Sequence, residues 1–168
     1  SNLLPSLAGA TVHMVGIGGI SMSGLCEILL SLGIHVTGSD EKNSPNIERL
    51  RLKNVPVFLK QEPSNITNQN LVVYTAAMPI DHPELEEARR KGIPVIDRAT
   101  LLGEIMHMYE KSIAVSGTHG KTTTTSIISF CLMEAGMDPT IHVGGILDAI
   151  GGTTRIGASQ FFVTEACE

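Results

Sequence analysis

A short stretch of glycine, lysine and threonine has the residue types and spacing needed to bind phosphate. It reads Ser116-Gly117-Thr118-His119-Gly120-Lys121-Thr122-Thr123, follows the apolar residues 113–115 and opens a segment with apolar residues at helical spacing. In such a turn, backbone N–H groups and the positive helix end face the phosphates of a nucleotide triphosphate. The lysine reaches the outer phosphates, and the threonine hydroxyl ligates Mg²⁺. The stretch therefore predicts ATP binding by residues 117–123.

This loop is shorter than the usual phosphate-binding pattern, which has a glycine where Val115 stands. An ordinary glycine-rich turn before a helix is the alternative. Lys121 is the strongest candidate for a catalytic role, because a lysine at a helix start would otherwise repel the positive helix end. His119 lies between two glycines and could face a substrate, or it could be a loop histidine without a role.

A second glycine loop, Gly16-Ile17-Gly18-Gly19-Ile20-Ser21-Met22-Ser23-Gly24, follows the β-branched run 11–15 and precedes a helical pattern that ends at Gly33. A second strand, 34–38, leads to Asp40, roughly twenty positions past the loop, as in dinucleotide-binding folds. Ser21 replaces the third glycine of that fingerprint. The pattern predicts a diphosphate site, with Asp40 near a ribose hydroxyl. A nicotinamide or flavin dinucleotide, a purely structural turn and a solvated Asp40 are the alternatives. The residues expected at this site are Gly16, Gly18, Gly19, Ile20, Ser21, Met22, Ser23 and Asp40.

Glu165 follows the apolar run 161–163, where phosphate-loop enzymes place a carboxylate that holds or orients Mg²⁺. Thr122 and Glu165 would supply two oxygen ligands, although Glu165 could also be a solvent-facing acid at a strand end. Glu168 is a weaker candidate, and His142 is more typical of a core or strand-end histidine. Four scattered histidines receive no role: His13, His35, His82 and His107.

Alternating strand and helix patterns predict an α/β fold. Strands expected at 11–15, 34–38, 55–58, 71–74 and 93–96 make residues 1–107 a Rossmann-like domain with a doubly wound parallel sheet. Residues 108–168 begin a second, ATP-binding α/β domain of the phosphate-loop type. It includes strands at 112–115 and 140–143, an irregular Gly/Thr stretch and the apolar run 161–163. Two or three strands and one helix cannot close such a domain, so we expect it to be incomplete.

The apolar spacing also predicts which helical side chains face inward. In the helix that begins at Ser44-Pro45 these are Ile47, Leu50 and Leu52. In the helix after the phosphate loop they are Ile127, Ile128, Leu132 and Met133.

Composition narrows the class of protein. The 168 residues carry a net charge of −5, which disfavours nucleic acid or an anionic membrane as the main partner. The three cysteines lack Cys-x-x-Cys spacing, which indicates a reducing compartment without a zinc site. Neither a signal peptide nor a membrane-spanning stretch is recognisable, so we expect a cytoplasmic protein. Exposed strand edges after residue 108 make self-association a possibility.

The order of three motifs resembles the Mur ligase family: Gly-x-Gly-Gly-x-x-Met-Ser-Gly at 16–24, Gly-Thr-His-Gly-Lys-Thr-Thr at 117–123 and Glu-Ala-Cys-Glu at 165–168. The resemblance implies ATP-dependent joining of L-alanine to the carboxylate of UDP-N-acetylmuramate through an acyl phosphate, in peptidoglycan precursor synthesis. It places residues 16–23 on the UDP diphosphate and Asp40 near the uridine. It also places Thr118 and His119 between the ATP and muramyl sites, and Thr122 and Glu165 on Mg²⁺.

The resemblance covers the whole sequence but only roughly the first third to two-fifths of a family member. It places a second-metal histidine, a carbamylated lysine found in several members and the C-terminal amino-acid-binding domain beyond Glu168. We therefore expect this chain to bind a UDP-linked ligand with little or no ligase activity of its own.

Three other functions stay open. A recycling ligase that joins UDP-N-acetylmuramate to a tripeptide shares the second loop, but usually has Cys and Phe where Gly19 and Met22 stand. A nicotinamide-dependent oxidoreductase would account for the first loop and leave the second unexplained. A nucleotide-sensing module would leave the first loop without a purpose.

Overall fold

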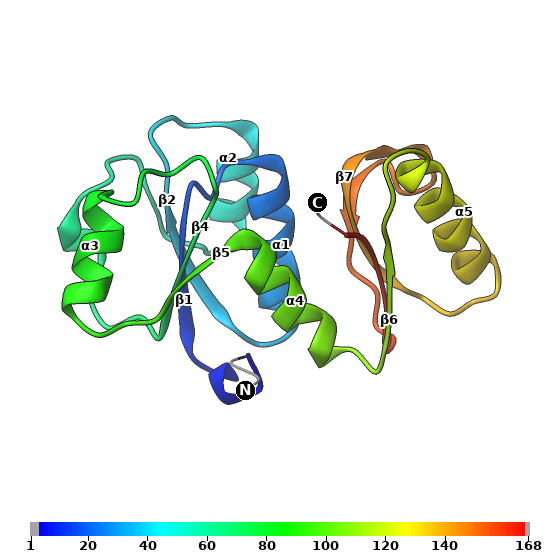
Figure 1. Ribbon diagram of the computed structural model, residues 1–168, viewed down its shortest axis with the longest axis horizontal. Coiled ribbons are helices and arrows are strands. Elements are labelled where there is room, and N and C mark those ends of the chain that lie inside the picture. Colours follow the sequence, from blue (N-terminus) through cyan, green and yellow to red (C-terminus); the bar gives the residue numbers. More distant parts are fainter. Residues whose placement is uncertain (1–3, 167–168) are drawn as a thin grey trace. The chain divides into compact units, whose positions relative to one another are not determined.

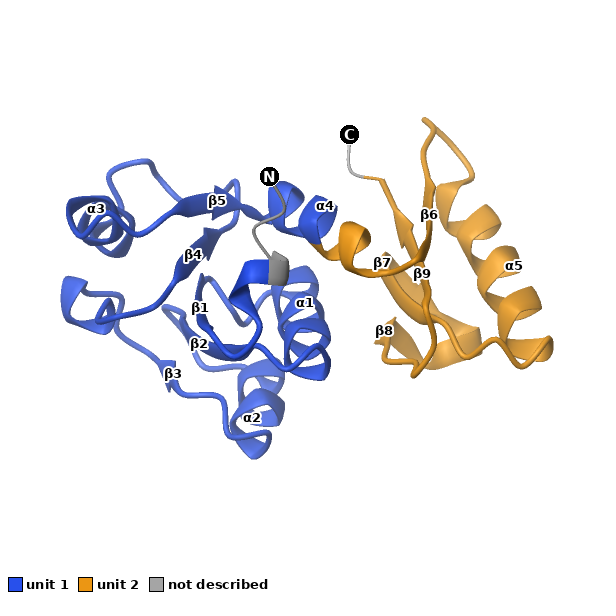
Figure 2. Cartoon of the chain, turned by 90° about the horizontal axis from the view of Figure 1, so that it is seen from below, with its two compact units in different colours: residues 1–104 blue, residues 105–168 orange. Residues whose placement is uncertain are grey.

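The computed structural model describes residues 4–166, which form two compact units (Figure 2). The first unit ends at Glu104 and the second begins at Ile105. The functional division expected at residues 107 and 108 stays a prediction. No helix in residues 4–166 is long and apolar enough to cross a membrane.

The first unit contains a five-stranded sheet in the order β3-β2-β1-β4-β5, with every pair parallel (Figure 1). This confirms the doubly wound parallel sheet. The strand order reverses beside β1, and ligands in open α/β sheets bind at the carboxyl ends of the strands at such a point. The strands are β1 Thr11–Val15, β2 His35–Ser39, β3 Val57–Phe58, β4 Leu71–Tyr74 and β5 Val95–Asp97.

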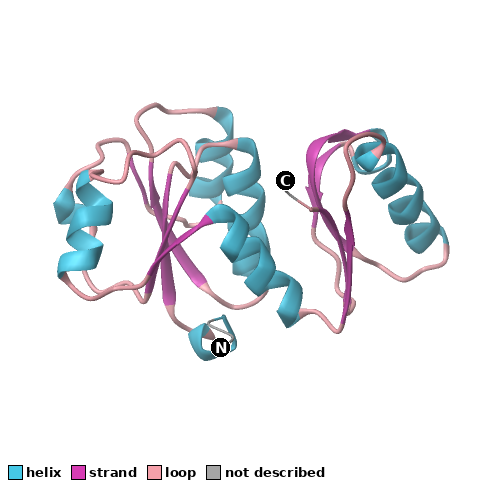
Figure 3. Ribbon diagram, viewed as in Figure 1, coloured by secondary structure: helices cyan, strands magenta, loops and turns pink. Residues whose placement is uncertain are grey.

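Helices cover both faces of this sheet, with α1 and α2 on one side and α3 on the other (Figure 3). Leu85 and Ala88 of α3 pack in an apolar cluster with Val15 and Val72. The fourth helix, α4, runs across the division between the two units. The helices are η1 Leu4–Leu7, α1 Ile20–Ser31, α2 Pro45–Leu52, η2 Pro63–Asn65, α3 Pro83–Arg90 and α4 Arg98–Met108.

Local sequence explains where α2 begins. Ser44 Oγ accepts a hydrogen bond from Ile47 N at 3.3 Å, and Pro45 occupies the first helical position. Ile47 and Leu50 are fully buried, as predicted, but Leu52 is 87% exposed. The prediction for Leu52 is wrong because a residue two positions after Leu50 lies on nearly the opposite side of the helix.

The second unit has a four-stranded sheet in the order β6-β9-β7-β8, covered on one face by α5. The first three strands in that order are parallel, and β8 pairs antiparallel with β7. The stretch expected to be irregular therefore contains a strand, reached through a turn at Gly151 with φ 64°. The elements are β6 Lys111–Val115, α5 Lys121–Glu134, β7 Thr140–Leu147, η3 Asp148–Ile150, β8 Gly152–Arg155 and β9 Phe161–Glu165.

The buried face of α5 differs by one residue from the prediction. Ile128, Leu132 and Met133 pack against an apolar cluster formed by β7 and β9, whereas Ile127 is 59% exposed. Thr125 is fully buried, and its hydroxyl donates to Lys121 O at 2.7 Å. The apolar spacing predicted that Ile127 faces inward, but the small polar residue Thr125 lies on the buried face instead.

Candidate functional site

The first glycine loop is held by the end of β2. Ser39 O accepts hydrogen bonds from Gly16 N and Ile17 N at 2.8 and 3.1 Å, and Asp40 Oδ2 accepts one from Gly18 N at 2.8 Å. A side chain at position 18 would crowd this contact, because a Cβ there would lie 2.8 Å from Asp40 Oδ2 and 3.0 Å from Ile47 Cδ1. Asp40 is thus at the predicted site, with one carboxylate oxygen bound to the loop itself.

The amides that remain for a ligand are those of the first turn of α1, which have no intrahelical acceptor. This turn begins at Ile20, whose side chain is 61% exposed, while the side chains of Met22 and Ser23 are buried. Ser23 N already donates to Gly19 O at 2.9 Å. Of the predicted residues 20–23, Ser23 is therefore excluded as a backbone donor to an anion, whereas residues 20–22 belong to the first turn, where no intrahelical acceptor exists.

A pocket of about 380 Å³ lies beside the loop. Its residues follow the carboxyl ends of β1, β2 and β4, the edge where ligands of such sheets bind. Five of them were not singled out from the sequence, although their place just after predicted strands is a usable signal. The pocket is lined by Gly16, Gly18, Gly19, Asp40, Lys42, Asn43, Ser44, Thr75 and Met78.

Arg98 is a further residue that the sequence motifs did not reveal. It directly follows β5, and its Nη1 donates to Ser21 Oγ at 3.2 Å. This contact brings a guanidinium group to the first turn of α1. Because that turn already favours anions, the added charge strengthens the site for a phosphate group.

The phosphate loop of the second unit connects β6 to α5, as predicted. Gly120 adopts the left-handed conformation with φ 76° and precedes Lys121, the first residue of α5. Residues 116–120 are exposed, including His119, and so are Thr122 and Thr123. A pocket of about 300 Å³ adjoins this helix start, with Thr122, Thr123 and Asp148 in its wall.

Glu165 lies beside the start of this loop. It ends β9 in register with Val115, and Ala166 N donates to Val115 O at 2.8 Å. Glu165 Oε2 is 3.4 Å from Gly144 N, whereas Oε1 is buried without a hydrogen-bond partner among the described residues. A buried carboxylate oxygen without a donor fits a cation.

The cation that best suits this place is Mg²⁺, because it takes few protein ligands together with phosphate oxygens and waters. Within residues 4–166, no group of three or more His, Cys, Asp and Glu side chains could hold a metal alone. Thr122 and Glu165 stay the predicted protein ligands, and Glu168 lies outside the described residues.

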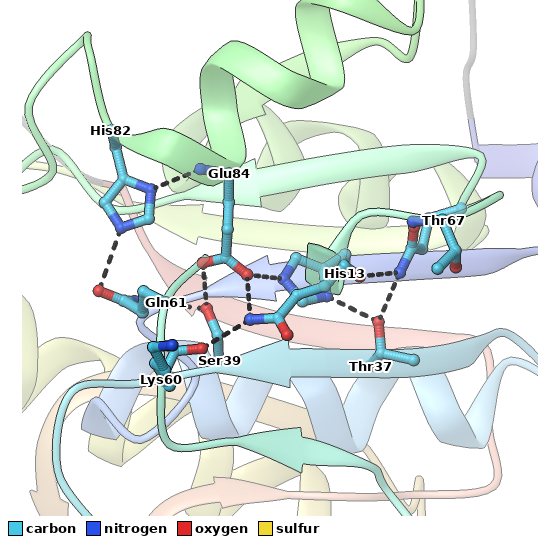
Figure 4. A network of polar contacts seen from close by, with 10 residues as sticks. His13, Thr37, Ser39, Lys60, Gln61, Thr67, His82 and Glu84 are labelled. Atoms are coloured by element: carbon cyan, nitrogen blue, oxygen red, sulfur yellow. Dashed lines mark hydrogen bonds and ion pairs between the residues drawn. The ribbon is translucent and has the colours of Figure 1, made fainter. Parts of the chain in front are cut away.

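The buried histidines lie in two different surroundings, one in each unit. His142 is buried in β7, and its Nδ1 lies 2.9 Å from Thr154 Oγ1 of β8, which fits the structural role expected for it. His13 and His82 received no role from the sequence, but both contact Glu84 in a buried polar cluster of the first unit (Figure 4).

Comparison with known proteins identifies relatives of this chain. Residues 11–110 match the model of the Mur ligase family, catalytic domain. A UDP-N-acetylmuramate–L-alanine ligase of Acetivibrio thermocellus is 59% identical over 157 residues, which are 94% of this chain and 34% of that protein. The ligase of the same name from Clostridium kluyveri is 58% identical over 158 residues, 94% and 35% of the two chains. This chain thus spans about a third of the length of these curated relatives.

Two solved structures share the fold over nearly the whole chain. The UDP-N-acetylmuramate–alanine ligase of Thermotoga maritima superposes with a TM-score of 0.80 at 31% identity, covering 93% of this chain and 37% of that one. A murein peptide ligase of Psychrobacter arcticus gives 0.83 at 28% identity, covering 95% and 38%. Together with the family match over residues 11–110 and the two phosphate loops at strand ends, these likenesses show that the chain belongs to the Mur ligase family.

Proposed function

We propose that this chain is the nucleotide-binding part of an ATP-dependent ligase that joins L-alanine to the carboxylate of UDP-N-acetylmuramate in peptidoglycan precursor synthesis. The observation that carries the proposal is the presence of two different phosphate-binding helix starts in one chain, at α1 and at α5. Relatives with 52–59% identity, all named as this ligase, support the choice of substrates.

In this proposal the first unit binds the UDP-linked sugar. The pocket beside Asp40 receives the uridine, and the first-turn amides of α1 bind the diphosphate. Arg98, which follows β5 and contacts Ser21 of that turn, adds positive charge there. The roles of Gly16, Gly18 and Gly19 are then to bring the backbone close to the ligand.

The second unit binds ATP. Lys121 and the amides of residues 117–123 face the phosphates, and Thr122 and Glu165 hold Mg²⁺, which offsets the negative charge of the phosphates. His119 and Thr118 lie on the exposed loop where the muramyl carboxylate would approach. Positioning and charge neutralisation supply most of the catalysis in phosphoryl transfer, which matches the residues present.

The proposed reaction has two steps. The muramyl carboxylate attacks the γ-phosphorus of ATP, ADP leaves, and an acyl phosphate forms on the sugar. The amine of L-alanine then attacks the acyl carbon, inorganic phosphate leaves, and the amide bond is complete. Lys121 stabilises the negative charge that develops in the first step.

The tripeptide-recycling ligase is the nearest alternative. A structure with that activity in its name, from Neisseria meningitidis, gives a TM-score of 0.80 at 27% identity, so the fold alone does not separate the two. The curated relatives favour L-alanine. The free thiols of Cys26 and Cys131 are consistent with the cytoplasmic location that we propose. Exposed Ile127, Phe130 and Ile146 support self-association of this chain.

Calorimetric titration tests the proposal. We expect UDP-N-acetylmuramate to bind this chain and NAD not to bind, and we expect no phosphate release when ATP and L-alanine are added. Binding of NAD in place of the UDP-sugar would point to a dinucleotide enzyme. Phosphate release at the rate of an intact ligase would show that this chain is catalytically sufficient.

A further inference from the structure

A charged side chain lies fully buried in the first unit, where the proposed reaction makes no use of it. Glu84 is the second residue of α3, and it is 0% exposed (Figure 4). Its carboxylate accepts hydrogen bonds from Ser39 Oγ at 2.6 Å, His13 Nε2 at 2.9 Å and Asn65 Nδ2 at 3.1 Å. An ionised carboxylate only accepts hydrogen bonds, so His13 Nε2 carries the proton in this contact.

Further contacts extend this cluster across the sheet face. His82 Nδ1 accepts a hydrogen bond from Glu84 N at 3.2 Å, which leaves its Nε2 to donate to Gln61 Oε1 at 3.1 Å. Gln61 Nε2 in turn donates to Ser39 Oγ at 3.3 Å. We call the six residues His13, Ser39, Gln61, Asn65, His82 and Glu84 the Glu84 cluster.

Glu84 is charged despite its burial. Burial raises the pKa of this carboxyl, but hydrogen bonds from His13, Ser39 and Asn65 outweigh that effect and hold the pKa below its ordinary value. A buried charge is costly to the fold even when it is well paired, and apolar side chains could fill the same space.

The contact to Ser39 connects the cluster to the glycine loop. Glu84 fixes the hydroxyl of Ser39, while the carbonyl oxygen of the same residue accepts from Gly16 N and Ile17 N. The next residue, Asp40, accepts from Gly18 N. Three successive loop amides thus point to the end of β2, and this path of the loop brings the first turn of α1 to the open edge of the sheet.

We propose that Glu84 is a positioning residue for the nucleotide site, which acts through Ser39 to hold the glycine loop in the shape that receives a diphosphate. The diphosphate as ligand rests on the proposed function, whereas the control of the loop does not. Glu84 itself touches no ligand, because it is enclosed by β1, β2 and the segment 60–69.

The test compares variants of the 168-residue chain by two measurements. Hydrogen exchange followed by NMR reports the protection of the Gly16, Ile17 and Gly18 amides. Calorimetry reports the affinity for UDP. The variants are Glu84→Ala and Ser39→Ala, with Glu84→Gln as the conservative replacement. Leu85→Ala is the matched control, because Leu85 is also fully buried on α3 but packs in the apolar cluster.

We expect Glu84→Ala to speed exchange of the three loop amides selectively and to weaken UDP binding by about tenfold or more, since it leaves buried donors unpaired. Ser39→Ala should show the same pattern, and it decides the question if Glu84→Ala does not fold. Glu84→Gln should keep loop-amide exchange and UDP affinity close to those of the unaltered chain. Its Oε1 can still accept a hydrogen bond from His13, and the Ser39 hydroxyl can turn to accept one from the Gln amide.

Leu85→Ala should change global stability without selective exposure of the loop amides. The proposal is overturned if the loop amides of Glu84→Ala and Ser39→Ala exchange in step with the rest of the unit, as in Leu85→Ala. It is equally overturned if UDP affinity is unchanged in both. If the unaltered chain fails to bind UDP, the proposed function is wrong, and the exchange data still decide the role of Glu84.

Discussion

Gly38 is the position where a single methyl group should disturb the nucleotide site most directly. It is the next-to-last residue of β2, where it has no positive φ and lies opposite Met14 of β1. An alanine Cβ there would lie 2.8 Å from Ile17 Cβ and 2.9 Å from Ile17 Cγ2. Because the Cβ of Ile17 is fixed to the backbone, a rotamer change cannot relieve the contact. The glycine loop or β2 must move.

The size of the effect follows from two opposing contributions. Overpacking of a close-packed core costs about 1–3 kcal/mol, and replacing glycine by alanine returns about 0.4–1 kcal/mol by restricting the unfolded chain. Because the contact involves a Cβ fixed to the backbone, the cost lies in the upper half of its range, about 2–3 kcal/mol, and the net loss for Gly38→Ala is about 1–2.6 kcal/mol. At about 4–8 °C per kcal/mol for a unit of this size, the melting temperature should fall by roughly 4–21 °C.

Thermal unfolding, which gives the melting temperature, and titration with UDP, which gives the affinity, test this prediction. Gly103→Ala is the control, since a Cβ at that position in α4 would meet no atom within 4 Å and alanine favours a helix by about 1 kcal/mol. We expect Gly38→Ala to lose both stability and UDP affinity, and Gly103→Ala to lose neither. A Gly38→Ala protein that melts as the unaltered chain does and binds UDP equally would refute the packing described for Ile17.

Three further predictions concern charge. Arg98→Gln should weaken UDP binding by about five- to tenfold and leave uridine binding unchanged. The control Arg90→Gln, which removes a surface partner of Glu87, should change neither affinity. An equal loss of uridine affinity in Arg98→Gln would show that Arg98 does not face phosphate. The lowered pKa of Glu84 means that its charge stabilises the fold above the ordinary value of 4.5 and ceases to do so as the pH falls through the folded-state pKa. Unfolding measured from pH 6 downward should therefore be less acid-sensitive in Glu84→Gln, and parallel curves would contradict this. Mg²⁺ should increase the affinity for ATP less in Glu165→Gln than in the unaltered chain, which titrations with ATP in the presence and absence of Mg²⁺ can measure. An equal increase in both proteins would show that Glu165 is not a Mg²⁺ ligand.

The elements that carry both phosphate loops could be predicted because their signals are local. A β-branched run, a glycine turn and a helical pattern lie within a few residues of one another at β1 and at β6, so no distant contact was needed to recognise them. The strand β8 in the second half of the second unit could not be predicted from local sequence. The Gly152-Thr153-Thr154 segment of β8 lacks the apolar alternation of a half-buried strand, and it forms a strand because β7 offers it a hydrogen-bonding edge.

The side chains that the sequence did not reveal are those brought together by long-range packing. His13 and Glu84 are 71 residues apart, and Ser21 and Arg98 are 77 apart, so their spacing carries no signal. Asp40 was placed at the loop by its distance from the glycines, but its bond to Gly18 depends on how β2 lies against β1. The sequence thus predicted two phosphate-binding loops, and the fold showed which distant residues contact the first of them.

The most direct test of the central claim, that the first unit receives a UDP-linked sugar at the start of α1, is an NMR titration of this chain with UDP-N-acetylmuramate. Amide resonances of residues 19–22 and of the pocket residues Asp40 and Thr75 should shift, with a single saturable site. Changes confined to residues 117–123, or none at all in a folded chain, would contradict it.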